Sequence, residues 1–460
     1  MLLLPVLFAA AVPSVAGDAT VAPGPGTRLA SLTAPAPATD PPVVLVVIDA
    51  LNASHTGAWG YQRDTTPALD GLARRGARFT SWISSSSWTR PAFTTILTGL
   101  PKKAHGLEMG EKPLQPRITT MAERFAKAGY RTAAFIGNPL ISRKWNHHQG
   151  FEVFADESTH GPFPPADVLV DAAIRWIDGV KDRPFFLCVF LSDPHAPYEA
   201  PAAARRFSLH VTPPTTSPPR EVMSPWTAAE QEAIIAAYDD EVAFADAGLG
   251  RLLDHLDAMG LGERAVVAVT ADHGEMMGEH NAWQHAWHMW EPVVRVPMVL
   301  AAPGRIPAGV VVTGTAGHED LMPTLLSLAG IPSGGPSIFT PGNRRPFTAY
   351  DAAGVRRSAL REGRWKLVRY EKVSAATFGK QNDETRYPSL TQPAPRYELF
   401  DLEADPGELD NRIDRPGDPV LLESLKAELR RRCPWKQAPA RIPRLDPETL
   451  DALRAAGYLE

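Results

Sequence analysis

The sequence predicts an α/β fold in which a doubly wound, mostly parallel sheet is flanked by helices and followed by a smaller C-terminal α+β subdomain. Three short, almost unbroken apolar runs indicate strands that are buried on both faces. They lie at 43–48 (VVLVVI), 185–191 (FFLCVFL) and 266–270 (VVAVT). Helical stretches lie between them, at 119–128 and at 229–259, and the second is long enough for more than one helix. Alternating strands and helices are typical of doubly wound α/β domains.

The texture of the chain changes after Pro341. Residues 348–370 read as short strands, a loop rich in Pro and Thr runs to Tyr397, and 420–432 have helical periodicity. A chain of 460 residues also exceeds what one ordinary domain needs. We therefore assign 42–340 to a large main domain and 341–460 to a C-terminal subdomain and tail.

The N-terminal residues predict export. Residues 1–17 form an apolar stretch that ends in small residues, as a signal peptide does, although a positive charge at its start is missing. The stretch is too short to span a bilayer comfortably. Residues 18–41 are rich in Pro, Ala and Thr and resemble a flexible linker. We expect a periplasmic or secreted protein with no stable membrane span after signal removal.

The composition of the chain indicates a globular protein and gives no sign of a nucleic-acid partner. Apolar residues make up 44% of the chain, enough for a sizeable core, and the formal net charge of -5 implies no particular partner. Lys and Arg are scattered without a basic run, so no nucleic-acid partner is expected. Of the two cysteines, Cys188 lies inside an apolar run and reads as buried, and no disulfide framework is implied.

Polar side chains follow each of the three predicted strands. The first strand ends at Asp49, the second at 192–195 (SDPH), and the third at Asp272 and His273. In open α/β sheets the site forms outside the carboxyl ends of the strands. One Asp at a strand end commonly just starts a turn, but three such endings with two Asp and two His fit a metal site better.

A candidate nucleophile lies at 87–99 (SWTRPAFTTILTG). Pro91 suits the first turn of a helix, which puts Thr89 or Arg90 at the cap. A hydroxyl there lies where the backbone N–H groups and the helix dipole favour anions. On this segment alone the simpler interpretation, that Thr89 only caps a helix, is favoured.

Longer blocks resemble the sulfatase family of the alkaline phosphatase superfamily. They begin with IDALNASHTGAWGYQRDTTPALDGLARRGARFT and SSWTRPAFTTILTGLPKKAHGL, and continue in order with SDPHAPYEAP, TADHGEMMGEHNAW, EPVVRVPMVLAAPG, HEDLMPTLLSLAGIP and YELFDLEADPGELDN. The resemblance extends over nearly all of the chain from residue 42 and implies that 42–340 is a sulfatase-like catalytic domain. Counting back from 97–99 (LTG) places Thr89 at the Cys or Ser position of the family's C/S-x-P-x-R motif.

The resemblance implies a role for each candidate residue. Asp49, Asp272 and His273 are the implied metal ligands, with Thr89 as metal-activated nucleophile and itself a ligand. His195 matches the histidine that faces the substrate or its leaving group. His285 falls where sulfatases often keep a lysine against the sulfate, and Arg90 lies beside the nucleophile.

Several positions depart from the sulfatase pattern. Sulfatases convert the Cys or Ser to formylglycine, and threonine offers no equivalent route to that aldehyde. Phe93 stands at the motif's Arg, Ala50 at the second Asp after the first strand, and 137–140 (GNPL) at a Gly-Lys-x-His segment. Several positive groups that hold a sulfate are thereby missing. The Asp-His pair, in place of Asp-Asn, favours zinc or manganese as the divalent metal over calcium, with magnesium also possible.

Three groups of lesser candidates have simpler interpretations. Lys102 and Lys103 could reach the anion, but a solvated turn is favoured. His280 and His288 could complete a second metal site with His285, and a stacked surface with Trp283, Trp287 and Trp290 explains them equally well. His147 and His148 lie in a polar loop and read as exposed.

We therefore predict a metal-dependent hydrolase of sulfate or phosphate esters, acting on a small-molecule, glycan or lipid ester. Chemistry favours a phosphate mono- or diester, because a threonine ester must be cleared by in-line attack of water. One alternative is a transferase that passes a phosphoryl-linked group to a glycan or lipid. The other is a binding protein that lost catalysis, against which the retention of all four site residues argues. The proline-rich loop at 210–226 is the expected source of specificity.

Overall fold

The computed structural model describes residues 27–28, 40–107, 112–211, 213, 226–285, 288–340, 347–351, 356–371 and 396–433. The predicted signal peptide, most of the predicted linker, most of the loop at 210–226 and the boundary at 341 lie outside these residues. Among the described residues, no helix is both long and apolar enough to cross a membrane.

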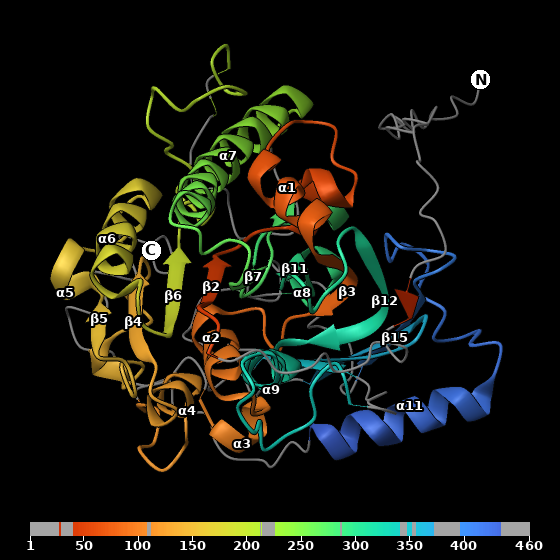
Figure 1. Ribbon diagram of the computed structural model, residues 1–460. Coiled ribbons are helices and arrows are strands. Elements are labelled where there is room, and N and C mark those ends of the chain that lie inside the picture. The colour runs from red at the N-terminus through yellow and green to blue at the C-terminus, as the bar shows by residue number, and fades with distance from the viewer. Residues whose placement is uncertain are drawn as a thin grey trace, which may run out of the picture.

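A mixed, mostly parallel sheet forms the centre of the main domain (Figure 1). Its strand order is β1-β12-β3-β11-β7-β2-β6-β4-β5, with β10 paired to β3. The short strands β10 and β11 run antiparallel to their neighbours, and the other pairings are parallel. The strands are β1 (Thr27–Arg28), β2 (Val43–Ile48), β3 (Ala77–Ile83), β4 (Arg131–Ile136), β5 (Val153–Ala155), β6 (Phe185–Leu191), β7 (Val266–Thr270), β10 (Arg295–Val296), β11 (Met298–Ala301) and β12 (Val310–Gly317). The predicted fold class is confirmed.

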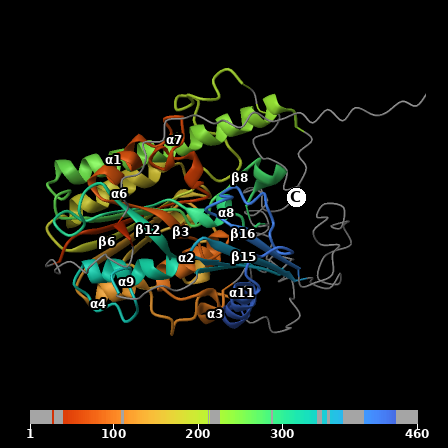
Figure 2. The same cartoon turned by 90° about the vertical axis from the view of Figure 1, so that its right-hand side faces the viewer.

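Helices cover both faces of this sheet (Figure 2). One face carries α1 (Pro67–Arg75), α6 (Ala166–Val180) and α7 (Ala228–Ala258), and the other carries α2 (Thr89–Thr98), α4 (Met121–Lys127) and α9 (His318–Leu328). Two single-turn helices, α3 (Lys102–His105) and α5 (Glu157–His160), lie in connections. Because helices shield both faces, strands β2, β6 and β7 are buried along their whole length, as their apolar runs predict.

Helix α7 differs from its prediction, because it is one continuous helix of 31 residues. Thr227 and Glu230 form a capping box at its start. The glycines inside it do not end it. Gly248 lies where α7 packs on α6, and a Cβ at that position would come within 3.2 Å of the Ala166 side chain.

The C-terminal subdomain is a four-stranded antiparallel sheet with one helix. The strands β13 (Phe347–Asp351), β14 (Arg356–Glu362), β15 (Trp365–Glu371) and β16 (Arg396–Asp401) pair in sequence order. Helix α11 (Pro419–Arg432) packs Leu422, Leu425 and Leu429 against one face of this sheet. The apolar residues at i, i+3 and i+7 form the buried side of the helix. This unit is the α+β subdomain that the sequence predicts.

Candidate active site

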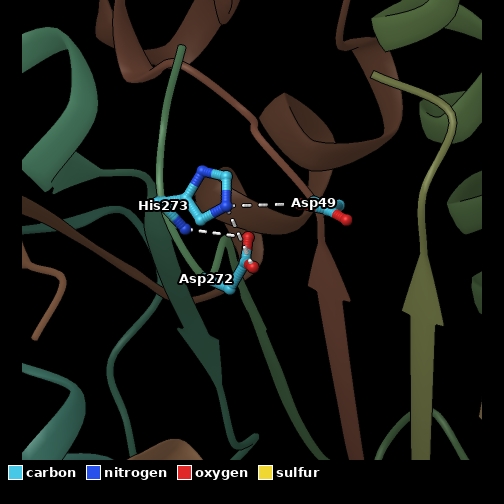
Figure 3. Close-up of side chains that lie close together, drawn as sticks. All are labelled: Asp49, Asp272 and His273. Atoms are coloured by element: carbon cyan, nitrogen blue, oxygen red, sulfur yellow. Dashed lines mark hydrogen bonds and ion pairs between the residues drawn. The ribbon is translucent and has the colours of Figure 1, made fainter. Parts of the chain in front are cut away.

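Three neighbouring parallel strands bring the candidate ligands together. Strands β7, β2 and β6 are adjacent in the sheet, and Asp272, Asp49 and the 192–195 segment follow their carboxyl ends. Asp49, Asp272 and His273 converge from two of these ends (Figure 3), and one ligand-type atom from each lies within 4.8 Å of the others. The predicted convergence at the strand ends is therefore observed.

The two carboxylates fit a bound cation. Asp49 and Asp272 are fully buried, and their Oδ1 and Oδ2 atoms, respectively, have no hydrogen-bond partner among the described residues. These oxygens lie 3.6 and 3.4 Å from Nε2 of His273. Buried charged groups are normally paired or bind metal, so an acceptor-only cluster of this kind matches a divalent cation. A potential metal-binding group is thus present.

The backbone fixes the ring of His273. Its Nδ1 lies 3.0 Å from the carbonyl oxygen of Gly274, so Nδ1 carries the proton that it donates there. The lone pair is then on Nε2, the nitrogen that faces the carboxylates, as a metal-binding imidazole requires. Gly274 cannot be replaced without movement, because a Cβ there would lie 2.0 Å from the carbonyl oxygen of Pro292.

Burial is the main cause that shifts the pKa values of the two carboxylates. Burial, and then the charge of Asp272, raise the pKa of Asp49 well above its ordinary value. Burial also raises the pKa of Asp272, although the neighbouring His273 and hydrogen bonds from the backbone N–H groups of His273 and Ala50 partly oppose the rise. A divalent cation between the two carboxylates would offset both effects, because it favours their ionised forms.

Neighbouring groups hold the carboxylates in place. Asn138 Nδ2 donates a 2.7 Å hydrogen bond to Asp49 Oδ2, and the backbone N–H groups of Ala50 and His273 donate to Asp272 Oδ1 at 3.3 and 2.8 Å. Ala50 has a φ of 54°, which is rare for a residue with a side chain. The sequence indicates 137–140 only as a departure from the family pattern, and the role of Asn138 was not predicted.

Thr89 is the first residue of α2, and its side chain points at Asp49, Asp272 and His273, which we call the ligand cluster. Its Oγ1 lies 3.2 Å from Nε2 of His273, and the residue is fully buried. The N-cap is Trp88, so the expectation that Thr89 or Arg90 occupies the cap is wrong by one residue. Pro91 lies in the first turn, as predicted. The geometry therefore joins the hydroxyl to the two carboxylates and the imidazole at a helix N-terminus.

Arg90 points to a different neighbourhood. Its guanidinium lies 3.9 Å from the ring centroid of Trp145 and donates to the carbonyl oxygen of Lys112. The side chain is buried, and burial lowers its pKa to about 9. A catalytic role for Arg90 stays a prediction.

The two remaining candidates, His195 and His285, lie against each other and against the ligand cluster. Their ring centroids are 5.0 Å apart, and the His285 ring is 4.2 Å from that of His273. Nδ1 of His195 lies 2.7 Å from the carbonyl oxygen of Ala196, and Nδ1 of His285 lies 3.0 Å from Oε1 of Glu275. The sequence predicted both histidines but not Glu275, which is fully buried.

Burial of the lesser candidates differs from expectation at three of four positions. His147 is buried, with Nε2 3.2 Å from Thr94 Oγ1, and His148 is half-buried, so their expected exposure is wrong. Lys103 is exposed as expected, whereas Lys102 is buried.

His280 and His288 stack on Trp290 with centroid distances of 3.9 and 4.3 Å, which matches part of the predicted stacked surface. Trp283 instead packs on Trp226, and Trp287 lies outside the described residues. In the part of the chain that the structure describes, only Asp49, Asp272 and His273 form a group that could hold a metal.

The family follows from a comparison with known families. The sulfatase family model matches residues 41–331, and a model described as N-sulphoglucosamine sulphohydrolase, C-terminal, matches 278–433. The first match spans more than half of the chain. The chain belongs to the sulfatase family, within the alkaline phosphatase superfamily.

Relatives of known name agree with this assignment. The chain is 26% identical to an ulvan-active sulfatase of Formosa agariphila, over 86% of this chain and 81% of the relative. It is also 26% identical to arylsulfatase K of Rattus norvegicus, over 94% and 84%. A similar solved structure is the phosphonate monoester hydrolase of Agrobacterium radiobacter, with a TM-score of 0.66, 21% identity and coverage of 84% of this chain and 96% of that chain.

A further solved structure, in complex with its substrate D-glucosamine-2-N,6-O-disulfate, has a TM-score of 0.67 at 18% identity and covers 88% of this chain and 100% of that chain. At 18% and 21% identity, the similarity to these two solved structures shows the fold alone.

Proposed function

We propose that this protein hydrolyses a sulfate or phosphate ester, with Thr89 as nucleophile and Asp49, Asp272 and His273 as ligands of a divalent metal ion. The observation that carries the proposal is the 3.2 Å distance between Thr89 Oγ1 and the same His273 nitrogen that faces both carboxylates. The N-cap of α2 is another residue, Trp88, so capping of this helix does not account for Thr89.

The donor set supports the choice of metal. Two carboxylates and one imidazole suit zinc or manganese, with calcium or magnesium as weaker fits. Such an ion would lower the pKa of the Thr89 hydroxyl and neutralise charge on the ester oxygens. Thr89 itself would complete the ligand set through Oγ1.

The residues of this chain support two displacements at phosphorus. In the first, Thr89 Oγ1 loses its proton to solvent and forms a bond to phosphorus while the bond from phosphorus to the alcohol oxygen breaks, and a protonated His195 gives its proton to the departing oxygen. In the second, water attacks phosphorus, the bond from phosphorus to Thr89 Oγ1 breaks, and one proton of that water returns to Oγ1. Phosphate leaves from a monoester substrate and a phosphate monoester from a diester, and His195 regains its proton from solvent. In a sulfatase the formylglycine hydrate attacks sulfur and the sulfated hydrate then collapses by elimination, so water need not attack sulfur, and threonine has no such route. We therefore favour phosphate mono- or diesters over sulfate esters.

Substrate and location remain parts of the same proposal. The curated relatives include an ulvan-active sulfatase and a choline-sulfatase, which supports either a glycan or a small-molecule ester as substrate. The apolar residues at 1–17 support export to the periplasm or the medium.

The deciding experiment changes Thr89 and measures turnover of aryl phosphate, phosphodiester and aryl sulfate substrates with purified, metal-loaded protein. Thr89→Ala should lose turnover, and Thr89→Ser should keep part of it because the hydroxyl remains. Acid quenching during turnover of a phosphate ester should trap added phosphate mass on the peptide that contains Thr89. Near-normal turnover in Thr89→Ala would remove the mechanism.

Thr98→Ala is the matched control. Thr98 is also a buried threonine of α2, and its hydroxyl donates a 2.6 Å hydrogen bond to the carbonyl oxygen of Thr94. Its loss should cost stability of about 1 kcal/mol and leave turnover within about twofold.

A further inference from the structure

A fully buried glutamate, Glu275, lies beside the ligand cluster and has no role in the proposed chemistry so far. It follows His273 by two residues, and its Oε1 lies 3.0 Å from Nδ1 of His285. The hydroxyl of Tyr198 donates to its Oε2 at 3.3 Å, and Asn52 Nδ2 donates to its backbone carbonyl at 2.8 Å. Bonds at both ends of the residue hold the carboxylate in one position.

The partner of Glu275 lies at the centre of the histidine cluster. The His285 ring is 4.2 Å from the ring of His273 and 5.0 Å from that of His195, and Trp88 meets its edge at 5.8 Å. His285 is buried, so its environment on several sides is protein. Because Glu275 occupies Nδ1, contact between this imidazole and a substrate falls to Nε2.

An imidazole at this position needs an orienting group in a way that a lysine does not. An ammonium carries three donors that rotate freely on a long flexible chain. An imidazole has two nitrogens in fixed directions, and the partner of one decides the tautomer and the direction of the other. Outer groups of this kind typically change affinity or activity by about 10- to 100-fold when removed.

We propose that Glu275 is a positioning residue that acts through His285, holding its imidazole so that Nε2 faces the ester group bound at Thr89 and stabilises the transition state. This inference rests on the proposed function, since it assigns His285 to the ester subsite of that site. Its chemistry requires the doubly protonated imidazolium, in which Nδ1–H donates to the Glu275 carboxylate and Nε2–H donates to an oxygen of the transferred phosphoryl or sulfuryl group.

A double-mutant cycle tests the proposal. Glu275→Gln, His285→Ala and the double variant are compared with wild type for kcat and KM on an aryl phosphate, each protein being metal-loaded. Glu275→Gln should lower kcat about 10- to 100-fold with little change in KM, because the contact strengthens only in the transition state. In the His285→Ala background the same change should alter kcat less than about threefold, because the residue through which Glu275 acts is gone.

The matched control is Glu398→Gln in the C-terminal sheet. Glu398 is likewise buried, and the Tyr370 hydroxyl donates to it at 2.9 Å, so the substitution removes the same kind of group away from the site. Melting temperature and elemental analysis accompany each variant, and Glu275→Gln should retain its metal. Equal losses of kcat in both backgrounds, or loss of the metal in Glu275→Gln, would overturn the proposal.

A second readout separates this inference from the proposed function. The same four proteins are titrated with orthovanadate by calorimetry, and Glu275→Gln should weaken binding about tenfold only where His285 is present. If Thr89→Ala keeps its turnover, the nucleophile assignment fails while the vanadate cycle still decides the role of Glu275. If vanadate binding weakens equally with and without His285, the positioning role fails whatever Thr89 does.

Discussion

Asp272→Asn should have opposite effects on stability in the presence and absence of metal. The amide retains Oδ1, which accepts from the backbone N–H groups of His273 and Ala50, so the local fold keeps both hydrogen bonds. It removes the negative charge and replaces Oδ2, the oxygen that faces His273 Nε2 at 3.4 Å. The substitution therefore deletes a candidate metal ligand without deleting the bonds that shape the loop.

The magnitude follows from the spacing of the charges. The ligand atoms of Asp49 and Asp272 lie within 4.8 Å of each other. Two unit charges at that distance repel by roughly 3 kcal/mol at an effective dielectric constant near 20. Chelated wild type at pH 8 carries this repulsion and the cost of burial, so chelated Asp272→Asn should be at least as stable. With metal at about a thousandfold above its dissociation constant, wild type should gain about 4 kcal/mol and the variant much less.

The assay is urea unfolding of both proteins with and without a chelator, together with elemental analysis of the untreated samples. Asp246→Asn is the control, because Asp246 is a buried carboxylate that accepts two backbone N–H groups, from Ala68 and Leu69, away from the ligand cluster. Its response to the chelator should match that of wild type. Full metal occupancy in Asp272→Asn, or a chelated variant more than about 2 kcal/mol less stable than chelated wild type, would refute the reasoning.

Three further outcomes are expected. The stability that metal adds to wild type should grow from pH 5 to pH 8. Burial raises the folded-state pKa of Asp49, so without metal the stability that this carboxyl contributes is lost as pH rises through that pKa. A metal-dependent difference in unfolding free energy that stays constant over this range would contradict this prediction. His195→Ala should slow alkyl esters roughly a hundred- to ten-thousand-fold but nitrophenyl esters little, whereas equal slowing would make it a structural residue. Lys366→Met should lower the free energy of unfolding in urea by about 3–5 kcal/mol, because the buried Lys366 Nζ lies 3.1 Å from Oε1 of Glu291 and 2.7 Å from Oε1 of Glu408. A loss below about 1 kcal/mol would contradict this ion-pair role.

The sequence predicted the elements that burial dictates. Strands β2, β6 and β7 have the predicted bounds, because an unbroken apolar run ending in Asp or Ser changes character at one residue. The ligand cluster was predictable for the same reason, since parallel strands end at one edge of the sheet. Helix α7 was harder, because its interior glycines resemble a break until the packing on α6 is known.

The supporting residues could not be predicted, because their partners are distant in sequence. Asn138 reaches Asp49 across 89 residues of chain, and Tyr198 reaches Glu275 across 77. His147 was expected to be exposed because its neighbours in sequence are polar, yet Thr94 and Phe93 of α2 cover it. Local composition does not contain the tertiary contact that decides burial.

The position of Phe93 bears on how this site holds an anion. The sulfatase motif has an arginine there, whereas Phe93 is fully buried and meets the rings of His147 and Phe190 at 5.9 and 5.5 Å. Arg90 does not take over that role in the described contacts, because its guanidinium stacks on Trp145. In the proposed function fewer fixed cations would then surround the ester, so more of the anion's stabilisation would fall to the metal ion, the start of α2 and the imidazoles. An imidazole would serve in that way only if it were held in one orientation, which is the function that we propose for Glu275 through its contact with His285.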